Sequence, residues 1–304
     1  MTTVPLTAPP VRPRLTRVLL RLHRPALYAW TLLVLAAATV LFLLHGPLVD
    51  SAAEGWRQFR DCGMDRYCAY DQSAILRYKN WYDYSTLALV AVPFLTAAWA
   101  GGALVGTELE SGTAQLAWAQ SSSPVRWLTV RLAAPAALVT VGTGLLVWLH
   151  HLAWAAGRGR IDSAKTWYDV WTFHTNGPTL VALALAGLAA GALAGLLLRR
   201  TLPALGLGLL LTGAVWGSAQ LLLPRLWPAT TRWWSHATGA PSGSWQLTEG
   251  RSADRARYYV TYHTYADYWP LQLTTTALLL TTAALLTLAC FLTLRRLTGK
   301  AAAR

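Results

Sequence analysis

Six long apolar runs constrain this chain more than any other feature of its sequence. They cover residues 26–44, 84–105, 133–153, 179–198, 203–223 and 271–294. About 20 helical residues cross the roughly 30 Å hydrocarbon core of a bilayer, and each run is close to that length. Backbone groups in lipid must find their hydrogen bonds within the segment, so we expect six transmembrane α-helices. The 54% hydrophobic and 13% charged residues support an all-α integral membrane protein.

The basic residues near the ends of the runs indicate an orientation. They precede the first run, fill the short turn after the fourth and follow the last: Arg14, Arg17, Arg21, Arg24, Arg199, Arg200, Arg295, Arg296 and Lys300. This places both termini in the cytoplasm, with outer loops at 45–83, 154–178 and 224–270 and an inner loop at 106–132. The outer loops hold about as many basic residues, but they are longer and carry most of the acids. The net charge of +13 suits anionic lipid headgroups and requires no nucleic-acid partner.

The first 25 residues divide into two parts. Residues 1–13 are rich in proline, and we expect a disordered cytoplasmic tail before a single transmembrane domain at 14–304. Leucines and a valine then recur on one helical face, opposite Arg14, Arg17, Arg21 and Arg24. This pattern predicts an amphipathic helix in the membrane interface. A simple positively charged anchor for the first span is the alternative.

The first outer loop contains two cysteines, Cys62 and Cys68. An outer loop lies in an oxidising compartment, so we predict a disulfide between them. Two free thiols are the alternative, and a metal site is disfavoured because no histidine lies near them in the sequence. Cys290, inside the last run, is expected to be a packing residue.

A polar segment at 107–131 interrupts the apolar pattern. It begins Glu108-Leu109-Glu110-Ser111-Gly112-Thr113 and continues through Trp118, Gln120 and Arg126-Trp127. These residues resemble type 2 ATP-binding-cassette (ABC) transporter permeases, in particular the actinobacterial variety. The sequence around the Arg199-Arg200 turn is similar to the same family. With the six-span spacing, the resemblance covers nearly the whole membrane domain.

The resemblance implies the architecture of a type 2 ABC exporter permease and a role for the polar segment. In that family the segment couples the permease to its ATPase, which implies this role for Glu108, Glu110, Gly112, Thr113, Trp118 and Gln120. Arg199 and Arg200 would provide a second, smaller contact. From the residues alone, Glu108 and Glu110 could instead offset the dipole of a short helix that follows them. The family also has an interfacial helix before its first span, which matches residues 14–25.

The resemblance further implies the partners and the energy source. The permease would pair with a second copy, homologous or identical, and with an ABC ATPase subunit that binds ATP and Mg²⁺. This chain has no Gly-x-x-x-x-Gly-Lys-Ser/Thr loop, so we expect no cofactor and no catalytic residue in it. Export of an unidentified substrate across a bacterial plasma membrane is the expected function. The excess of arginine over lysine fits a GC-rich bacterial genome.

The segment also departs from the family pattern. Thr107, Gln115 and Pro124 stand where the group often has basic residues, and Arg131 replaces a frequent lysine. Fewer positive charges imply a weaker electrostatic contact, or an ATPase with a differently charged surface.

Other classes of protein fit the sequence less well. The spans carry no deep charged residue, which disfavours an ion-coupled secondary transporter. A membrane-embedded sensor or scaffold with the permease fold is the main alternative. An intramembrane metal-dependent enzyme would have to use His45, His150 and His151, but adjacent histidines point to different helix faces.

Two further patterns concern packing. Gly187, Gly191 and Gly195 form a small face on the fourth span, and we expect it to pack within the chain; packing against a second permease is the alternative. The last outer loop is rich in tyrosine and tryptophan, which predicts an interfacial aromatic belt. The spacing of Tyr258, Tyr262, Tyr265 and Trp269 also fits one helical face, similar to the short gating helices of the family.

Overall fold

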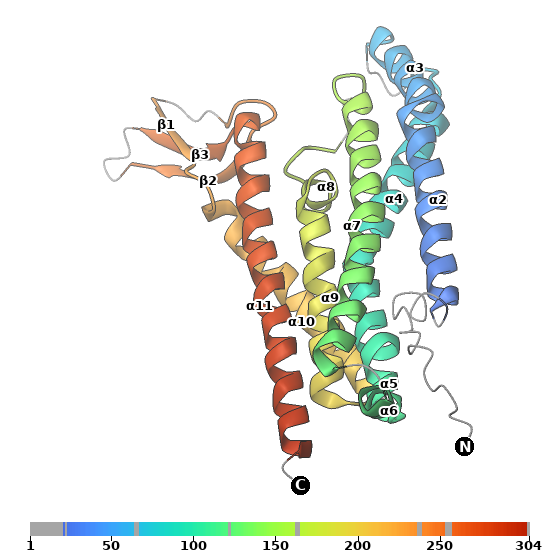
Figure 1. Ribbon diagram of the computed structural model, residues 1–304. Helices are drawn as coiled ribbons and strands as arrows, with labels where there is room; N and C mark the ends of the chain where they lie inside the picture. Colours follow the sequence, from blue (N-terminus) through green and yellow to red (C-terminus); the bar gives the residue numbers. More distant parts are fainter. Residues whose placement is uncertain are drawn as a thin grey trace, which may run out of the picture.

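The computed structural model describes residues 21, 23–63, 67–120, 123–161, 165–235, 239–252 and 257–302. Within these residues six helices are long and apolar enough to cross a membrane, as predicted. They contain α2 (Arg24–His45), α4 (Gln72–Trp99), α7 (Pro124–Gly157), α9 (Thr179–Leu198), α10 (Thr201–Leu222) and α11 (Tyr268–Ala302). Figure 1 shows them as an elongated bundle. Arg21 and Arg24 are described, and Arg24 begins α2; the tail, Arg14 and Arg17 lie outside the described residues.

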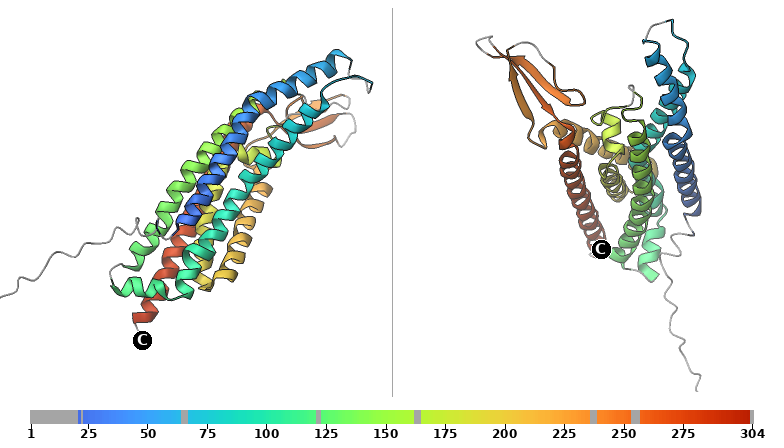
Figure 2. Two further views of the ribbon diagram at one scale, coloured as in Figure 1. Left: turned by 90° about the vertical axis from the view of Figure 1, so that its right-hand side faces the viewer. Right: turned by 90° about the horizontal axis from the view of Figure 1, so that it is seen from above.

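The two ends of the bundle differ. One end holds the C-terminus and two short helices, α5 (Thr107–Glu110) and α6 (Thr113–Gln120). The other end holds a small β-sheet and helix α3 (Pro47–Asp61), which lie on opposite sides of it when seen from above (Figure 2). We call these the α6 end and the sheet end.

The segment predicted as the first outer loop, 45–83, is mostly helical. Helix α3 is amphipathic and buries Val49, Ala52 and Ala53, while its polar side chains stay exposed. Helix α4 starts twelve residues before the apolar run, because the Asp71 carboxylate caps it by accepting the Ala74 N–H at 3.0 Å. Cys62 and Cys68 lie between these helices and form a disulfide.

Helix α9 is the central helix of the bundle and packs against α4, α7, α10 and α11. Its glycines allow this close approach. A Cβ at Gly191 would lie 2.1 Å from the Ala97 carbonyl oxygen, and one at Gly187 would lie 2.5 Å from that of Pro93. The predicted packing of this small face within the chain is therefore confirmed. Cys290 of α11 is also buried, with its thiol 3.5 Å from the Ala189 carbonyl of α9.

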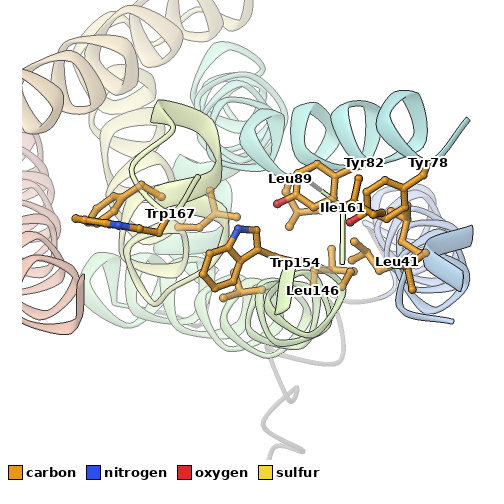
Figure 3. Close-up of a cluster of buried hydrophobic side chains, with 14 of the residues drawn as sticks. Leu41, Tyr78, Tyr82, Leu89, Leu146, Trp154, Ile161 and Trp167 are labelled. Atoms are coloured by element: carbon orange, nitrogen blue, oxygen red, sulfur yellow. The ribbon is translucent and has the colours of Figure 1, made fainter. Parts of the chain in front are cut away.

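The largest buried cluster lies toward the sheet end. Figure 3 shows Tyr78, Tyr82 and Leu89 of α4 beside Leu41 of α2 and Leu146 of α7. Trp154 and Trp167 extend the cluster toward α8 (Val170–Thr175) and the sheet. This core fixes the position of the segments that protrude beyond the apolar spans.

The last outer loop forms a three-stranded antiparallel sheet in the order β1-β3-β2. Its strands are β1 (Thr230–Trp234), β2 (Trp245–Arg251) and β3 (Tyr258–His263), and 3₁₀ turns flank it at Leu223–Arg225 and Tyr265–Asp267. The helical face proposed for the aromatic residues is wrong, because Tyr258 and Tyr262 lie on β3. Tyr262 is buried, and Tyr259 packs on Trp233 with ring centroids 5.1 Å apart. These rings therefore contribute to the sheet rather than to a separate helix.

Candidate coupling surface

The polar segment begins where α4 becomes a π-helix, η1 (Ala100–Gly106). Pro93 lies inside α4 and donates no backbone hydrogen bond there. Glycines then allow η1 to approach α10 closely: a Cβ at Gly101 would lie 2.7 Å from the Ala204 carbonyl oxygen. Since π-helical turns are frequent at functional sites, the end of α4 is a good position for a moving connection.

Gly112 makes the turn between α5 and α6. Its φ of +76° lies in the left-handed region, which a glycine adopts without strain. The Thr113 hydroxyl then donates to the Glu108 carbonyl oxygen at 3.3 Å, which ties α6 back to α5. Both residues thus shape the segment, and Thr113 also remains exposed.

The Glu108 carboxylate is buried against α7. It accepts the indole N–H of Trp127 at 3.0 Å and forms an ion pair with Arg131. The Arg131 guanidinium also lies over the Trp127 ring, 4.4 Å from its centroid, and Trp118 packs edge-on against the same ring. Glu108 therefore joins α5 to α7, and its carboxylate faces this internal pair rather than the basic surface of a partner.

Glu110 joins α5 to α10. Its carboxylate accepts the backbone N–H of Thr201 at 2.8 Å and also the Thr201 hydroxyl, so it caps the first turn of α10. The Thr107 and Thr201 hydroxyls lie 3.3 Å apart beside it. The alternative role of offsetting a helix dipole thus applies to Glu110, but the helix concerned is α10 and not the short helix that follows.

The structure places the α9–α10 turn, predicted as a second contact for the ATPase, next to the α5–α6 segment. Arg199 and Arg200 are exposed in the turn between α9 and α10, immediately before Thr201. Arg199 adopts a left-handed conformation with φ +53°, and its N–H bonds to the Gly195 carbonyl at 2.9 Å. Glycine is the usual residue at this position of a helix end, so Arg199 occupies it at some cost in backbone strain.

The outward side of the segment is a mixed apolar and polar surface. We call it the α6 surface and define it by the exposed residues Gln115, Leu116, Ala119, Gln120, Val125 and Arg126. Leu116 is 60% exposed, which is notable for a leucine outside the apolar spans. Trp118 is half-buried and supports the surface from behind through Trp127.

Three residues important for this geometry were not among the predicted site residues. Thr201 is the partner of Glu110, and Trp127 and Arg131 hold Glu108. Trp127 and Arg131 are four residues apart and so share a face of α7. From the sequence, that spacing could have identified Trp127 and Arg131 as neighbours on one helix face. Nothing near them in the sequence connects this pair with Glu108.

The histidines proposed for metal catalysis do not converge. His150 is buried between the Thr86 hydroxyl at 2.9 Å and the Asn176 side-chain oxygen at 2.5 Å, whereas His45 lies 3.2 Å from the Leu152 carbonyl oxygen. In the part of the chain that the structure describes, no three His, Cys, Asp or Glu side chains are grouped as metal ligands. His150 is thus part of a polar contact between α4, α7 and the segment after α8.

Comparison with known proteins agrees with the resemblance seen in the sequence. A family model described as ABC-2 membrane transporter related matches residues 31–226, from α2 to the 3₁₀ turn after α10. No curated protein and no solved structure matches the chain. The matched region contains the whole α5–α6 segment and the α9–α10 turn. This chain therefore belongs to the ABC-2 membrane transporter related family, as a membrane-spanning permease component.

Proposed function

We propose that this chain is the permease subunit of an ABC exporter and that its ATPase subunit docks on the α6 surface. The observation that carries the proposal is the double attachment of α5, through Glu108 to α7 and through Glu110 to α10. A force applied to α6 would reach two spans through short side-chain contacts. The exposed Leu116 supplies apolar area for a partner, while Arg126, Arg199 and Arg200 supply positive charge.

The mechanism follows from this arrangement. The partner binds ATP and Mg²⁺, and closure of its nucleotide sites displaces α6. The Glu108–Arg131 pair and the Glu110–Thr201 cap then shift α7 and α10 relative to α9, which opens and closes a path between two permease copies. In this proposal the α6 end and both termini face the cytoplasm of a bacterium, and the sheet end lies outside the plasma membrane.

Association with an ATPase tests the proposal. The tagged permease is purified from its native host, and ATP hydrolysis is measured in the purified complex after reconstitution in lipid nanodiscs. We expect Leu116→Glu to reduce the associated ATPase activity at least tenfold, because it places a charge in an apolar contact. Val170→Glu, which changes a 47% exposed valine at the sheet end, is the matched control and should have no such effect.

The same experiment separates the exporter from a sensor or scaffold. An exporter requires that the bound ATPase responds to the permease, so Glu110→Ala should alter its rate of hydrolysis even when the complex stays intact. Hydrolysis that is unchanged by Glu110→Ala in an intact complex would favour the scaffold, and activity that is unchanged by Leu116→Glu would contradict docking on the α6 surface. If no ATPase copurifies with the wild-type permease, docking on the α6 surface is wrong.

A further inference from the structure

A cavity of about 640 Å³ lies at the sheet end. Its walls come from α3, the end of α7, the loop leading to α8, the turn before β2 and the segment that joins β3 to α11. Figure 2 shows α3 and the sheet on opposite sides of this end, with α7 and α8 between them. The volume falls in the range of cavities that bind small molecules, roughly 300–1,000 Å³.

Two buried indoles form one wall, and their polar atoms are already paired. Trp154 Nε1 donates to the Lys165 carbonyl at 2.9 Å, and Trp167 Nε1 donates to the Gly243 carbonyl at 2.8 Å. Gly243 has a φ of +76° and forms a turn in which Ser244 N–H bonds to the Pro241 carbonyl. The rings are thus fixed in place.

The cavity also carries positive charge that the described residues do not neutralise. Of its three cations, Lys165 forms an ion pair with Asp83 at 3.3 Å. Arg60 and Arg158 have no ion pair with any residue that the structure describes. Their neighbours Arg57 and Arg160 do have acidic partners, Glu54 and Asp50.

The Arg158 guanidinium is positioned by aromatic rings. It lies 4.2 Å from the centroid of Tyr265 and 4.9 Å from that of Trp154. Stacking of this kind orients the guanidinium and leaves its N–H edges available to an anion. Across the cavity, α3 presents Trp56 and Arg60, which are one helical turn apart and so share a face. Trp56 is half-buried, with ring surface still available.

We infer that this cavity binds a ligand in which an anionic group, such as a phosphate or carboxylate, is attached to a flat ring. The anion contacts Arg158 and Arg60, and the ring packs on Trp56. A guanidinium binds such anions through charge-assisted hydrogen bonds, whereas the indole binds a ring through its face. The inference goes beyond the proposed function, because neither ATP nor the α6 surface takes part in it.

Binding of a simple aromatic phosphate tests the assignment. The full-length protein is placed in nanodiscs of phosphatidylcholine, and 1-naphthyl phosphate, 1-naphthylmethanol and inorganic phosphate are titrated by calorimetry. We expect 1-naphthyl phosphate to bind roughly tenfold more tightly than either of the others, since it alone engages both parts of the site. Equal affinities for the phosphate and the neutral alcohol would overturn the inference, as would no binding of any probe at millimolar concentration.

Variants assign the binding to this cavity. Arg158→Gln should weaken 1-naphthyl phosphate roughly tenfold and leave the alcohol unchanged, while Trp56→Leu should weaken both ring compounds. Arg126→Gln, an exposed arginine at the α6 end, is the matched control and should change neither. The melting temperature of each variant verifies that it folds. Unchanged affinity in Arg158→Gln, with folding intact, would show that the probe binds elsewhere.

A final arm distinguishes a soluble ligand from a lipid. Nanodiscs that contain phosphatidylglycerol present an anionic headgroup next to the sheet end. If this lipid competes with 1-naphthyl phosphate in the wild-type protein but not in Arg158→Gln, the anion in the cavity is a lipid headgroup. If it does not compete, the ligand is soluble.

Discussion

Among single residues, Glu108 has the largest predicted effect on stability. Its carboxylate is about nine-tenths buried and paired with Arg131, so Glu108→Gln leaves a buried guanidinium without a counter-charge. We expect a loss of about 3 kcal/mol, measured as a lower melting temperature by intrinsic tryptophan fluorescence in detergent. The double variant Glu108→Gln/Arg131→Met should recover most of it, because it removes both charges. Glu54→Gln breaks a pair that is more than half exposed and should cost well under about 1 kcal/mol. Equal losses in the two single variants would contradict this account.

His174 predicts a dependence of stability on pH. It lies in α8, and burial lowers its pKa from 6.5 to about 4, with the adjacent Gln220 side chain opposing part of the shift. The unfolded chain takes up the proton near pH 6.5, whereas the folded protein takes it up only near pH 4. The stabilisation is therefore complete above pH 6.5 and is lost as the pH falls toward 4, by about 3 kcal/mol in all. Melting temperatures from pH 7.5 to 4 should fall less steeply in His174→Gln than in the wild type. Parallel curves would show that His174 does not carry the effect.

Among the elements, the contact of α9 with α4 depends on Gly191. A Cβ there would lie 2.1 Å from the Ala97 carbonyl oxygen, so Gly191→Ala forces the two helices apart. We expect a cost of about 2 kcal/mol or more, read as a lower melting temperature. Gly206→Ala in α10 is the matched control, because its added Cβ meets no described atom within 4 Å apart from the neighbouring residues and backbone of its own helix. It should be neutral or slightly stabilising, since alanine favours the helix. An equal drop for both would mean that helix separation is not the cause.

The sequence predicted the helices well within the membrane, where lipid limits the possible structures, and predicted the helices and strands outside the membrane less well. Apolar length alone locates six spans, because a bilayer permits few alternatives. The helical start at Gln72 depends on a cap by Asp71 and on burial against α3, neither of which an apolar run reveals. Tyr258 and Tyr262 are four residues apart, a spacing that fits one helical face as well as one strand face. Only pairing with distant β1 and β2 selects the strand.

The same limit applies to the candidate site. The position of the α5–α6 segment and the acids in it follow from the sequence and its resemblance. Their partners do not, because Arg131 is 23 residues from Glu108 and Thr201 is 91 residues from Glu110. Such contacts require the arrangement of α7 and α10 around α5, which is a property of the folded bundle. Glu108 is therefore a buried connection to α7, whereas Glu110 is exposed and also bonds to Thr201 of α10.

For the whole molecule, the proposed orientation would place the α6 surface in the cytoplasm, where an ATPase could dock, and the cavity at the sheet end outside the cell. The disulfide between Cys62 and Cys68 lies toward the sheet end, which fits an oxidising environment there. The exposed Arg199 and Arg200 at the α6 end support the same proposal, because basic residues near span ends favour the cytoplasmic side.

Labelling with a membrane-impermeant maleimide in intact cells tests this orientation. In a Cys290→Ala background the disulfide is retained and no free cysteine remains. Ser242→Cys, at the rim of the cavity, should react in intact cells because it faces the outside. Gln115→Cys, on the α6 surface, should react only after the cells are permeabilised, which also serves as the control that its thiol is accessible. The reverse pattern would place the α6 surface outside the cell, where no ATP is supplied, and would exclude docking of an ATPase on it.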